Sequence, residues 1–207
     1  MLRSSALLAA LALAACAGPE APQRAAAAGA RLAPLPASFE NTPSCATCLA
    51  VALTLRPDGS YLVRERLGAS EFYDFGAWRE SPGEGTLRLE GGRDLPRSYA
   101  VHSADTLRAQ AGTQGGDLRR LAEVQSLAGP FRVVGLYDGN EFLECRTGLR
   151  FPVAASRAAE ALRKELGQRG GETVLVSLDA RFEPTRAGEA LVVQRTATIL
   201  NERGCPG

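Results

Sequence analysis

The sequence predicts a mainly β protein built from two small barrels, the second of which carries one helix. Three observations predict this fold class: short alternating apolar and polar runs, turn signals between them, and a single helix-length apolar pattern at 154–168. A chain of 207 residues has room for two domains of about 100 residues each. We therefore expect an antiparallel sheet that closes on itself, followed by an OB-like barrel with one helix.

The first half of the chain contains a series of short strand patterns with no helical pattern between them. In chain order, the predicted strands are 49–55, 61–67, 75–79, 86–89, 98–103 and 106–111. Pro57-Asp58-Gly59-Ser60 separates the first two strands and is typical of a hairpin turn. Short strands at this spacing predict a small antiparallel sheet that closes on itself.

The second half mixes strands with one helix. Residues 118–127 fit either a short helix or the start of this module, and strands are expected at 131–137, 141–145, 150–153, 173–182 and 190–200. Between the third and fourth of these strands, 154–168 has apolar residues at helical spacing, with one face made of Ala158, Ala161, Leu162 and Leu166. Five strands with a helix in this place are the pattern of an OB-like barrel.

The N-terminus predicts a signal peptide and a lipid anchor. Arg3 precedes an apolar run at 6–13 that is too short to span a bilayer. Leu13-Ala14-Ala15-Cys16 resembles the bacterial lipobox, in which the cysteine is acylated after cleavage. Each buried methylene of an acyl chain contributes about 0.8 kcal/mol, so we expect the membrane as a partner through Cys16. Ala17 is not Asp, which by similarity to lipoproteins of Gram-negative envelopes predicts the outer membrane, facing the periplasm.

These patterns divide the chain into five parts. They are a signal peptide at 1–15, a lipid anchor with an Ala/Pro-rich tether at 16–36, a β-barrel at 37–114, a linker at 115–128 and an OB-like domain at 129–207.

Charge and motif content exclude several classes of function. The formal net charge is +1 and the charges are interspersed, so no basic stripe is available for nucleic acid. Because the sequence has no phosphate-binding loop, nucleophile elbow or clustered catalytic set, we predict no enzymatic activity, no catalytic residue and no bound cofactor other than a metal. Trp78 is expected to pack inside the first barrel, and His102 to lie on its surface.

Apart from Cys16, the chain contains Cys45, Cys48, Cys145 and Cys205, which can pair in three ways. The domain boundary favours pairing within each module, and an envelope location permits disulfides. A bond between Cys145 and Cys205 would close a loop of about 60 residues and contribute about 4 kcal/mol, against about 2 kcal/mol for Cys45 with Cys48. The longer loop is therefore the better structural staple.

The chemistry of the Cys45-x-x-Cys48 pair stays open at this stage. Two reduced thiolates at this spacing suit a two-coordinate Cu(I) ion, with His102 as the sole further soft ligand once Met1 is removed. A catalytic dithiol would need a helix N-terminus, whereas 49–55 has a strand pattern. The third alternative is a small disulfide at the mouth of the first sheet.

Several segments, taken in order, carry a resemblance to a known family. They are 36–39 (PASF), Cys45-x-x-Cys48, 56–61 (RPDGSY), 75–78 (FGAW), 142–151 (FLECRTGLRF), 174–181 (VLVSLDAR) and the terminal Cys205. In this order they resemble the NlpE family, also called CutF, of outer-membrane lipoproteins in copper homeostasis and surface sensing.

The resemblance implies a lipocalin-like N-terminal barrel at 37–114, an OB-like C-terminal domain and a Cys145–Cys205 disulfide. It also implies a sensor or adaptor that reports envelope stress, surface contact or copper to a Cpx-type sensor kinase of the inner membrane. The alternative is a lipoprotein that binds Cu(I) or a small ligand without a signalling role.

Overall fold

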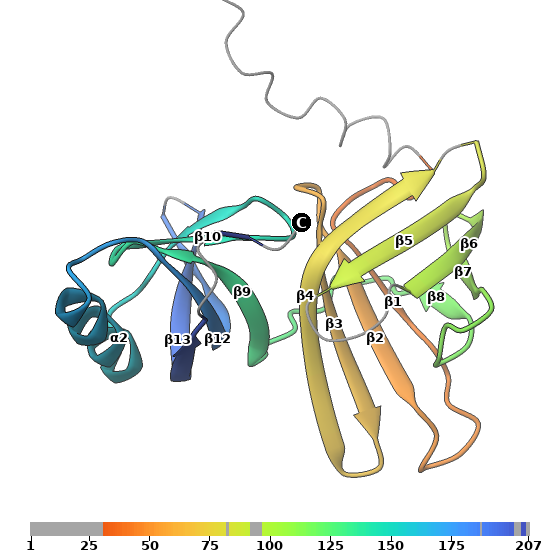
Figure 1. Cartoon of the computed structure of the whole chain (residues 1–207). Helices are drawn as coiled ribbons and strands as arrows, with labels where there is room; N and C mark the ends of the chain where they lie inside the picture. Colours follow the sequence, from red (N-terminus) through yellow and green to blue (C-terminus); the bar gives the residue numbers. More distant parts are fainter. Residues whose placement is uncertain (1–30, 82, 92–96, 187, 201–203, 206–207) are drawn as a thin grey trace, which may run out of the picture.

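The computed structural model describes residues 31–81, 83–91, 97–186, 188–200 and 204–205, and Figure 1 shows them as two β-barrels joined side by side. The predicted signal peptide at 1–15 and Cys16 lie outside the described residues. Within the described part of the chain, no helix is long and apolar enough to cross a membrane.

The first barrel is an antiparallel meander, for which the described residues supply eight strands. They are β1 (Ala37–Glu40), β2 (Ala50–Leu55), β3 (Ser60–Leu67), β4 (Ser70–Ser81), β5 (Thr86–Gly91), β6 (Arg97–Ser103), β7 (Thr106–Ala109) and β8 (Leu118–Arg120). Each strand pairs with its neighbour in the chain, and β8 pairs with β1, which closes the ring. The predicted closed antiparallel sheet is therefore confirmed, with a lipocalin-like up-and-down order.

Two strands of this barrel escaped the sequence analysis. β1 has four residues and β8 has three, so neither is long enough to show a clear alternation. Residues 118–120 fall inside the predicted linker, but Leu118 is fully buried and β8 pairs with β1 and β7. These residues therefore belong to the barrel wall, and the helical alternative for them is wrong.

The predicted tether at 16–36 also extends too far. Leu32 is fully buried in the core of the first barrel. Arg120 of β8 donates hydrogen bonds to the backbone oxygens of Leu32 and Pro34, the latter at 3.1 Å. Leu32 and Arg120 therefore hold residues 31–36 against the barrel, and we call this segment the strap. Its composition is that of a linker, which is why the sequence analysis assigned it to the tether.

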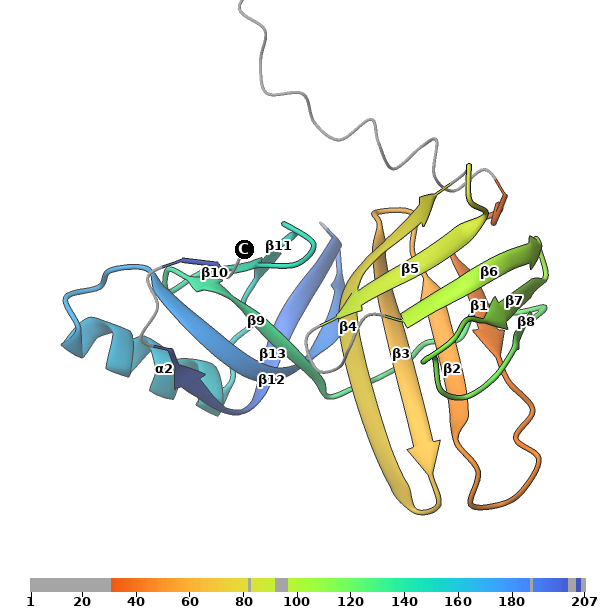
Figure 2. The same cartoon turned by 45° about the vertical axis from the view of Figure 1, so that its right-hand side comes forward.

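The second barrel has the strand pairing of an OB fold. Its described elements are β9 (Phe131–Tyr137), β10 (Glu141–Glu144), β11 (Arg150–Pro152), α2 (Arg157–Gln168), β12 (Val174–Thr185) and β13 (Gly188–Ile199). β9 pairs with β10 and β12, β10 pairs with β11, and β12 pairs with β13. A parallel bridge between Val153 and Leu191 joins the chain after β11 to β13. Figure 2 shows these strands with α2 beside them. The predicted OB-like barrel with a helix between its third and fourth strands is confirmed.

Helix α2 begins later than the sequence predicts. Ser156 caps it, since its Oγ accepts a hydrogen bond from the backbone nitrogen of Ala159 at 3.1 Å. The buried face consists of Ala159, Leu162 and Leu166, whereas Ala161, which the sequence placed on that face, is exposed. These three residues follow one another at spacings of three and four, so they lie on one face of the helix, and this face meets the barrel.

The two barrels share a hydrophobic interface on the outer wall of β4. The ring of Phe75 lies 4.8 Å from that of Phe182 and 6.1 Å from that of Phe151, measured between centroids. Tyr73 meets Phe131 edge-on at 5.7 Å. Ala52 and Leu62 belong to the same buried cluster, so the core of the second barrel continues onto the wall of the first.

Buried apolar side chains form a cluster inside the first barrel. Trp78 is 5% exposed, as expected, and its Nε1 donates to the backbone oxygen of Arg56 at 2.9 Å. Near the strap lies Glu80, whose carboxylate oxygens have no hydrogen-bond partner in the described residues. Arg31 forms an ion pair with it, with Nε 4.0 Å from Oε1. Burial raises the pKa of Glu80, and the charge of Arg31 lowers it by less.

Because Phe75 lies in the interface between the barrels, Phe75→Ala should lower the free energy of unfolding strongly. Removing a buried aromatic ring costs about 3–5 kcal/mol of unfolding free energy because a cavity remains. Phe72→Ala is the matched control, since Phe72 lies on the same strand with its side chain 45% exposed, and it should cost less than about 1 kcal/mol. Urea denaturation measures both, and equal losses would contradict the role assigned to the interface.

Glu80→Met should stabilise the protein in a pH-dependent way. The folded state holds the pKa of Glu80 above its ordinary value of 4.5. The stability that protonated Glu80 contributes is therefore lost as the pH rises through the folded pKa. Replacing a buried carboxylate that accepts no hydrogen bond from the described residues with an apolar side chain should gain about 1–3 kcal/mol at pH 8 and little at pH 4. Thermal melts at both pH values test this, and a gain that is the same at both would contradict it.

Candidate functional site

The predicted metal or redox pair lies on the loop between β1 and β2. Cys45 and Cys48 are joined by a disulfide, and the backbone nitrogen of Cys48 donates to the oxygen of Cys45 at 3.1 Å. Cys45 is exposed and Cys48 is half-buried. The pair therefore lies at the tip of a surface loop between two strands, without the helix N-terminus that a thioredoxin-like dithiol uses.

Asn41 fixes the base of this loop. Its Nδ2 donates to the backbone oxygens of Leu49, at 2.8 Å, and Gly115, while its Oδ1 accepts from the nitrogen of Val51 at 2.7 Å. Gly115 has a positive φ of 91°, and a Cβ there would collide with Val51. The β1–β2 and β7–β8 loops are thus tied together at this end of the barrel.

The surroundings of the two sulfurs are polar but poor in metal ligands. Ser44 Oγ lies 3.4 Å from Cys48 Sγ, and Thr47 Oγ1 lies 3.5 Å from Cys45 Sγ. His102 is on β6, with Nε2 3.5 Å from Arg108. Among the described residues, no three side chains of His, Cys, Asp or Glu gather into a metal-binding group. Binding of Cu(I) by Cys45 and Cys48 would first require reduction, because a thiolate is the ligand.

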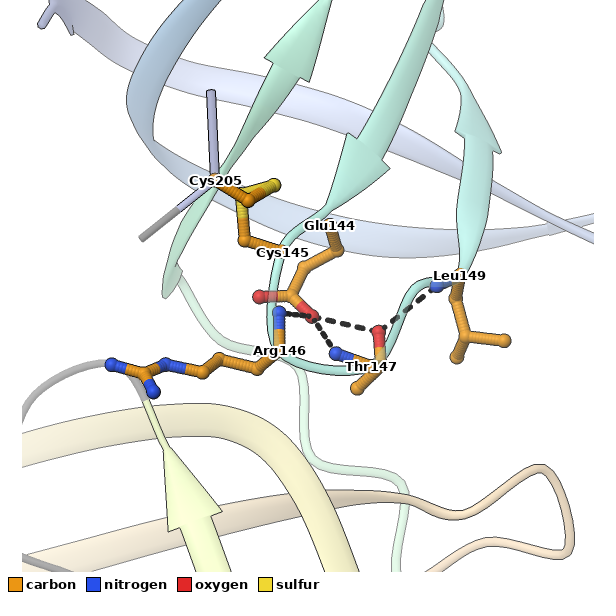
Figure 3. Close-up of a disulfide and its surroundings, with 6 residues drawn as sticks. All are labelled: Glu144, Cys145, Arg146, Thr147, Leu149 and Cys205. Carbon is orange, nitrogen blue, oxygen red and sulfur yellow. Dashed lines mark hydrogen bonds between the residues drawn. A yellow bond between two sulfur atoms is a disulfide. The ribbon is translucent and has the colours of Figure 1, made fainter. Parts of the chain in front are cut away.

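The second pair joins the end of the chain to the OB-like barrel. Cys145 follows β10 directly and is bonded to Cys205, 60 residues later (Figure 3). Cys145 is half-buried and Cys205 is exposed. The backbone nitrogen of Cys145 donates to the oxygen of Val134 on β9 at 2.9 Å. The bond therefore attaches the C-terminal segment to the turn that follows β10, beside β9.

A buried carboxylate that the sequence analysis missed holds the turn next to Cys145. Glu144 is 2% exposed, and its Oε2 accepts from the nitrogens of Arg146, at 3.1 Å, and Thr147, at 2.7 Å. The Thr147 hydroxyl also donates to it at 2.7 Å and accepts from the nitrogen of Leu149 at 3.2 Å, as Figure 3 shows. Burial raises the pKa of Glu144, and these hydrogen bonds partly oppose the rise.

The structure keeps the predicted cysteine pairs apart, with one in each barrel. Hollows lined by described residues lie outside the first barrel: one of about 510 Å³ beside Cys48 and Arg119, and one of about 610 Å³ between the barrels beside Arg56 and Phe151. Inside the barrel, the described apolar side chains form one buried cluster that includes Phe39, Trp78 and Tyr99.

Comparisons with known proteins place the chain in a family. A scan against models of protein families finds no match. The chain is 30% identical over 176 residues to Lipoprotein NlpE of Escherichia coli strain K12. The matched region covers 75% of this chain and 72% of that relative.

A solved structure, that of the Cpx pathway activator NlpE from Escherichia coli, covers 84% of this chain and 100% of its own, at 22% identity and a TM-score of 0.34. At that score the fold assignment rests on the strand pairing described above. The identity to the curated relative, spread over nearly three quarters of both sequences, shows that the chain belongs to the NlpE family of lipoproteins.

Proposed function

We propose that this protein is a non-enzymatic, lipid-anchored sensor or adaptor that reports envelope stress to a Cpx-type sensor kinase. The observation that carries the proposal is the 30% identity to Lipoprotein NlpE of Escherichia coli. A solved structure of that protein is described as the Cpx pathway activator. Surface contact, failed lipoprotein transport and copper are the stimuli that the proposal includes.

The length of the anchor supports a model in which location is part of the signal. We propose that Cys16 is acylated and that the protein faces the periplasm from the outer membrane. Between Cys16 and Arg31, where the docked strap begins, 15 residues span at most about 50 Å. The barrels then stay close to their own membrane, so contact with an inner-membrane kinase depends on a mislocalised or partly unfolded form.

The packing between the barrels supports a second route, through the integrity of the fold. The segment after β13 is tied to β12, since the nitrogen of Leu200 donates to the oxygen of Leu175 at 2.9 Å, and it leads to Cys205. β12 also carries Phe182, which meets Phe75 of the first barrel. Loss of the Cys145–Cys205 bond would therefore loosen a strand that helps to form the interface, and the first barrel would respond.

A reporter assay tests the proposed function. The full-length chain would be produced in Escherichia coli cells that lack their own NlpE and carry a reporter of the Cpx pathway. We expect overproduction to raise the reporter signal, and we expect the increase to disappear when the kinase gene is deleted. A reporter signal that is the same with and without the chain, although the chain is present and folded, would overturn the proposal.

The fold-integrity route predicts a difference between the two cysteine pairs. Cys145→Ser/Cys205→Ser should raise the reporter signal at least about twofold over wild type at equal protein level, because the looser second barrel populates the active form. Cys45→Ser/Cys48→Ser is the matched control and should leave the signal unchanged, since that bond spans a sequence separation of only 3 within one loop. Equal effects of both double variants would contradict this route.

Copper handling is a second candidate function, favoured by the exposure of Cys45 on its loop. After mild reduction, the protein should bind one Cu(I) through Cys45 and Cys48, whereas the oxidised protein should bind none there. Competition with a chromogenic Cu(I) chelator measures this. If the Cys45→Ser/Cys48→Ser variant retains the same Cu(I) as the reduced wild type, this pair is not the copper site.

A further inference from the structure

The strap at 31–36 is docked on the first barrel but is not part of its wall. No described strand pairs with these residues, and β1 begins at Ala37, directly after them. Leu32 is fully buried in the barrel core, Leu35 is half-buried, and the other residues of the strap are exposed. One buried side chain therefore supplies most of the apolar contact between the strap and the barrel.

The ring of the first barrel closes without the strap. β8 pairs with β1 through Phe39 with Arg120 and Glu40 with Arg119, and β1 pairs with β2 from Ala37 onward. Figures 1 and 2 both show β1 and β8 side by side. Because these backbone pairs all involve residues that follow the strap, the strap can leave the barrel while the wall stays closed.

Arg120 provides a docking site that is held in place by the barrel itself. Its Nε donates to the backbone oxygen of Ala104 at 2.8 Å and lies 3.4 Å from Oδ1 of Asp105. The guanidinium also lies over the ring of Phe39, 5.1 Å from its centroid. Its other two nitrogens donate to backbone oxygens of the strap. The strap therefore meets hydrogen-bond donors that are already oriented before it docks.

The docking site also contains a charge that weakens it. The side chain of Glu80 is 1% exposed, and its carboxylate accepts no hydrogen bond from the described residues. Its partner Arg31 belongs to the strap and is 54% exposed. Burial raises the pKa of Glu80 more than the charge of Arg31 lowers it. At neutral pH the ionised carboxylate is therefore a net cost to the docked state, which water would relieve once the strap is released.

The strap is also the part of the fold that takes up a pull on the anchor. The chain runs from Cys16 to the strap and only then into β1. Tension between the anchor and the barrels therefore acts on the contacts of the strap before it acts on the pairs of β1. Release of residues 31–36 would add at most about 20 Å to the reach of the tether.

We propose that the strap is a releasable clip, which leaves the barrel as a unit at its Leu32 and Arg120 contacts while the first barrel stays folded. Such a step is a local opening, distinct from unfolding of the whole chain. The inference rests on the proposed lipid anchor, for which it names the element that changes the reach. The docked strap keeps the tether short, and the released strap lengthens it.

Native-state proteolysis of the full-length protein tests the clip. Trypsin cleaves after arginine, and the Arg31–Leu32 bond can enter its active site only when the strap has left the barrel, because Leu32 is buried in the docked state. Mass spectrometry would measure the rate of cleavage at this bond in detergent at pH 8. This rate follows the population of the released strap when release and docking are fast.

Arg120→Met should raise this cleavage rate roughly tenfold or more, because the strap loses its oriented donors. Arg119→Met is the matched control, since Arg119 is the neighbouring residue on β8 and its side chain is exposed, and it should be cleaved like wild type. Leu32→Ala tests the same clip from the side of the strap. Its rate, normalised to the rate of the same variant unfolded in urea, should also rise roughly tenfold.

Glu80→Met should lower the cleavage rate roughly fivefold, because the docked state then no longer buries an ionised carboxylate. An unchanged or higher rate would contradict the weakening role of Glu80. Urea denaturation would verify that each variant is folded before cleavage is measured.

Phe75→Ala separates release of the strap from unfolding of the whole barrel. It weakens the interface with the second barrel, so cleavage at Arg31–Leu32 should match wild type if the strap opens by itself. If Phe75→Ala raises the rate as much as Arg120→Met, or if Arg119→Met and Arg120→Met are cleaved alike, the inference is overturned. No kinase is present in this measurement, so its failure would leave the Cpx reporter result standing, and failure of the reporter would leave the clip standing.

Discussion

The contact of Phe75 with Phe151 and Phe182 is the interaction on which the arrangement of this protein depends. An outward-facing phenylalanine on a barrel wall would be costly in water, and here it is buried because the second barrel covers it. The parallel pairing of Asp74 with Arg132 starts β9 beside β4, so the second barrel begins against the same wall. The two barrels thus share one buried cluster, and disorder in one becomes a packing defect in the other.

This constraint gives the cysteine pairs different consequences. The Cys45–Cys48 bond lies within one exposed loop whose base Asn41 already holds, so its loss affects that loop first. The Cys145–Cys205 bond joins segments 60 residues apart in a barrel whose strand β12 carries Phe182 into the interface. In the proposed function, the second pair reports on the whole molecule. In the same proposal, the first pair acts only within its own loop.

Sequence patterns predicted those elements in which alternation and turn chemistry act locally. β9 at 131–137 has the predicted bounds, and the turn before Ser60 is where the Pro57-Asp58-Gly59 signal placed it. β8 and the docking of Leu32 could not be predicted, because three residues and one side chain carry no periodicity. Phe75 and Phe182 could be assigned to strands, but their contact joins residues more than 100 positions apart. Glu144 was missed for a similar reason: its hydrogen bonds go to a turn whose geometry only the fold supplies.

The central claim is that the state of the second barrel reaches the first through their aromatic interface. Hydrogen exchange of the full-length protein, compared between wild type and Cys145→Ser/Cys205→Ser, tests it most directly. The account predicts faster exchange in β12 and β13 and also in β3 and β4 of the first barrel, with β6 to β8 unchanged. Faster exchange confined to the second barrel would contradict it, because the interface would then carry no signal.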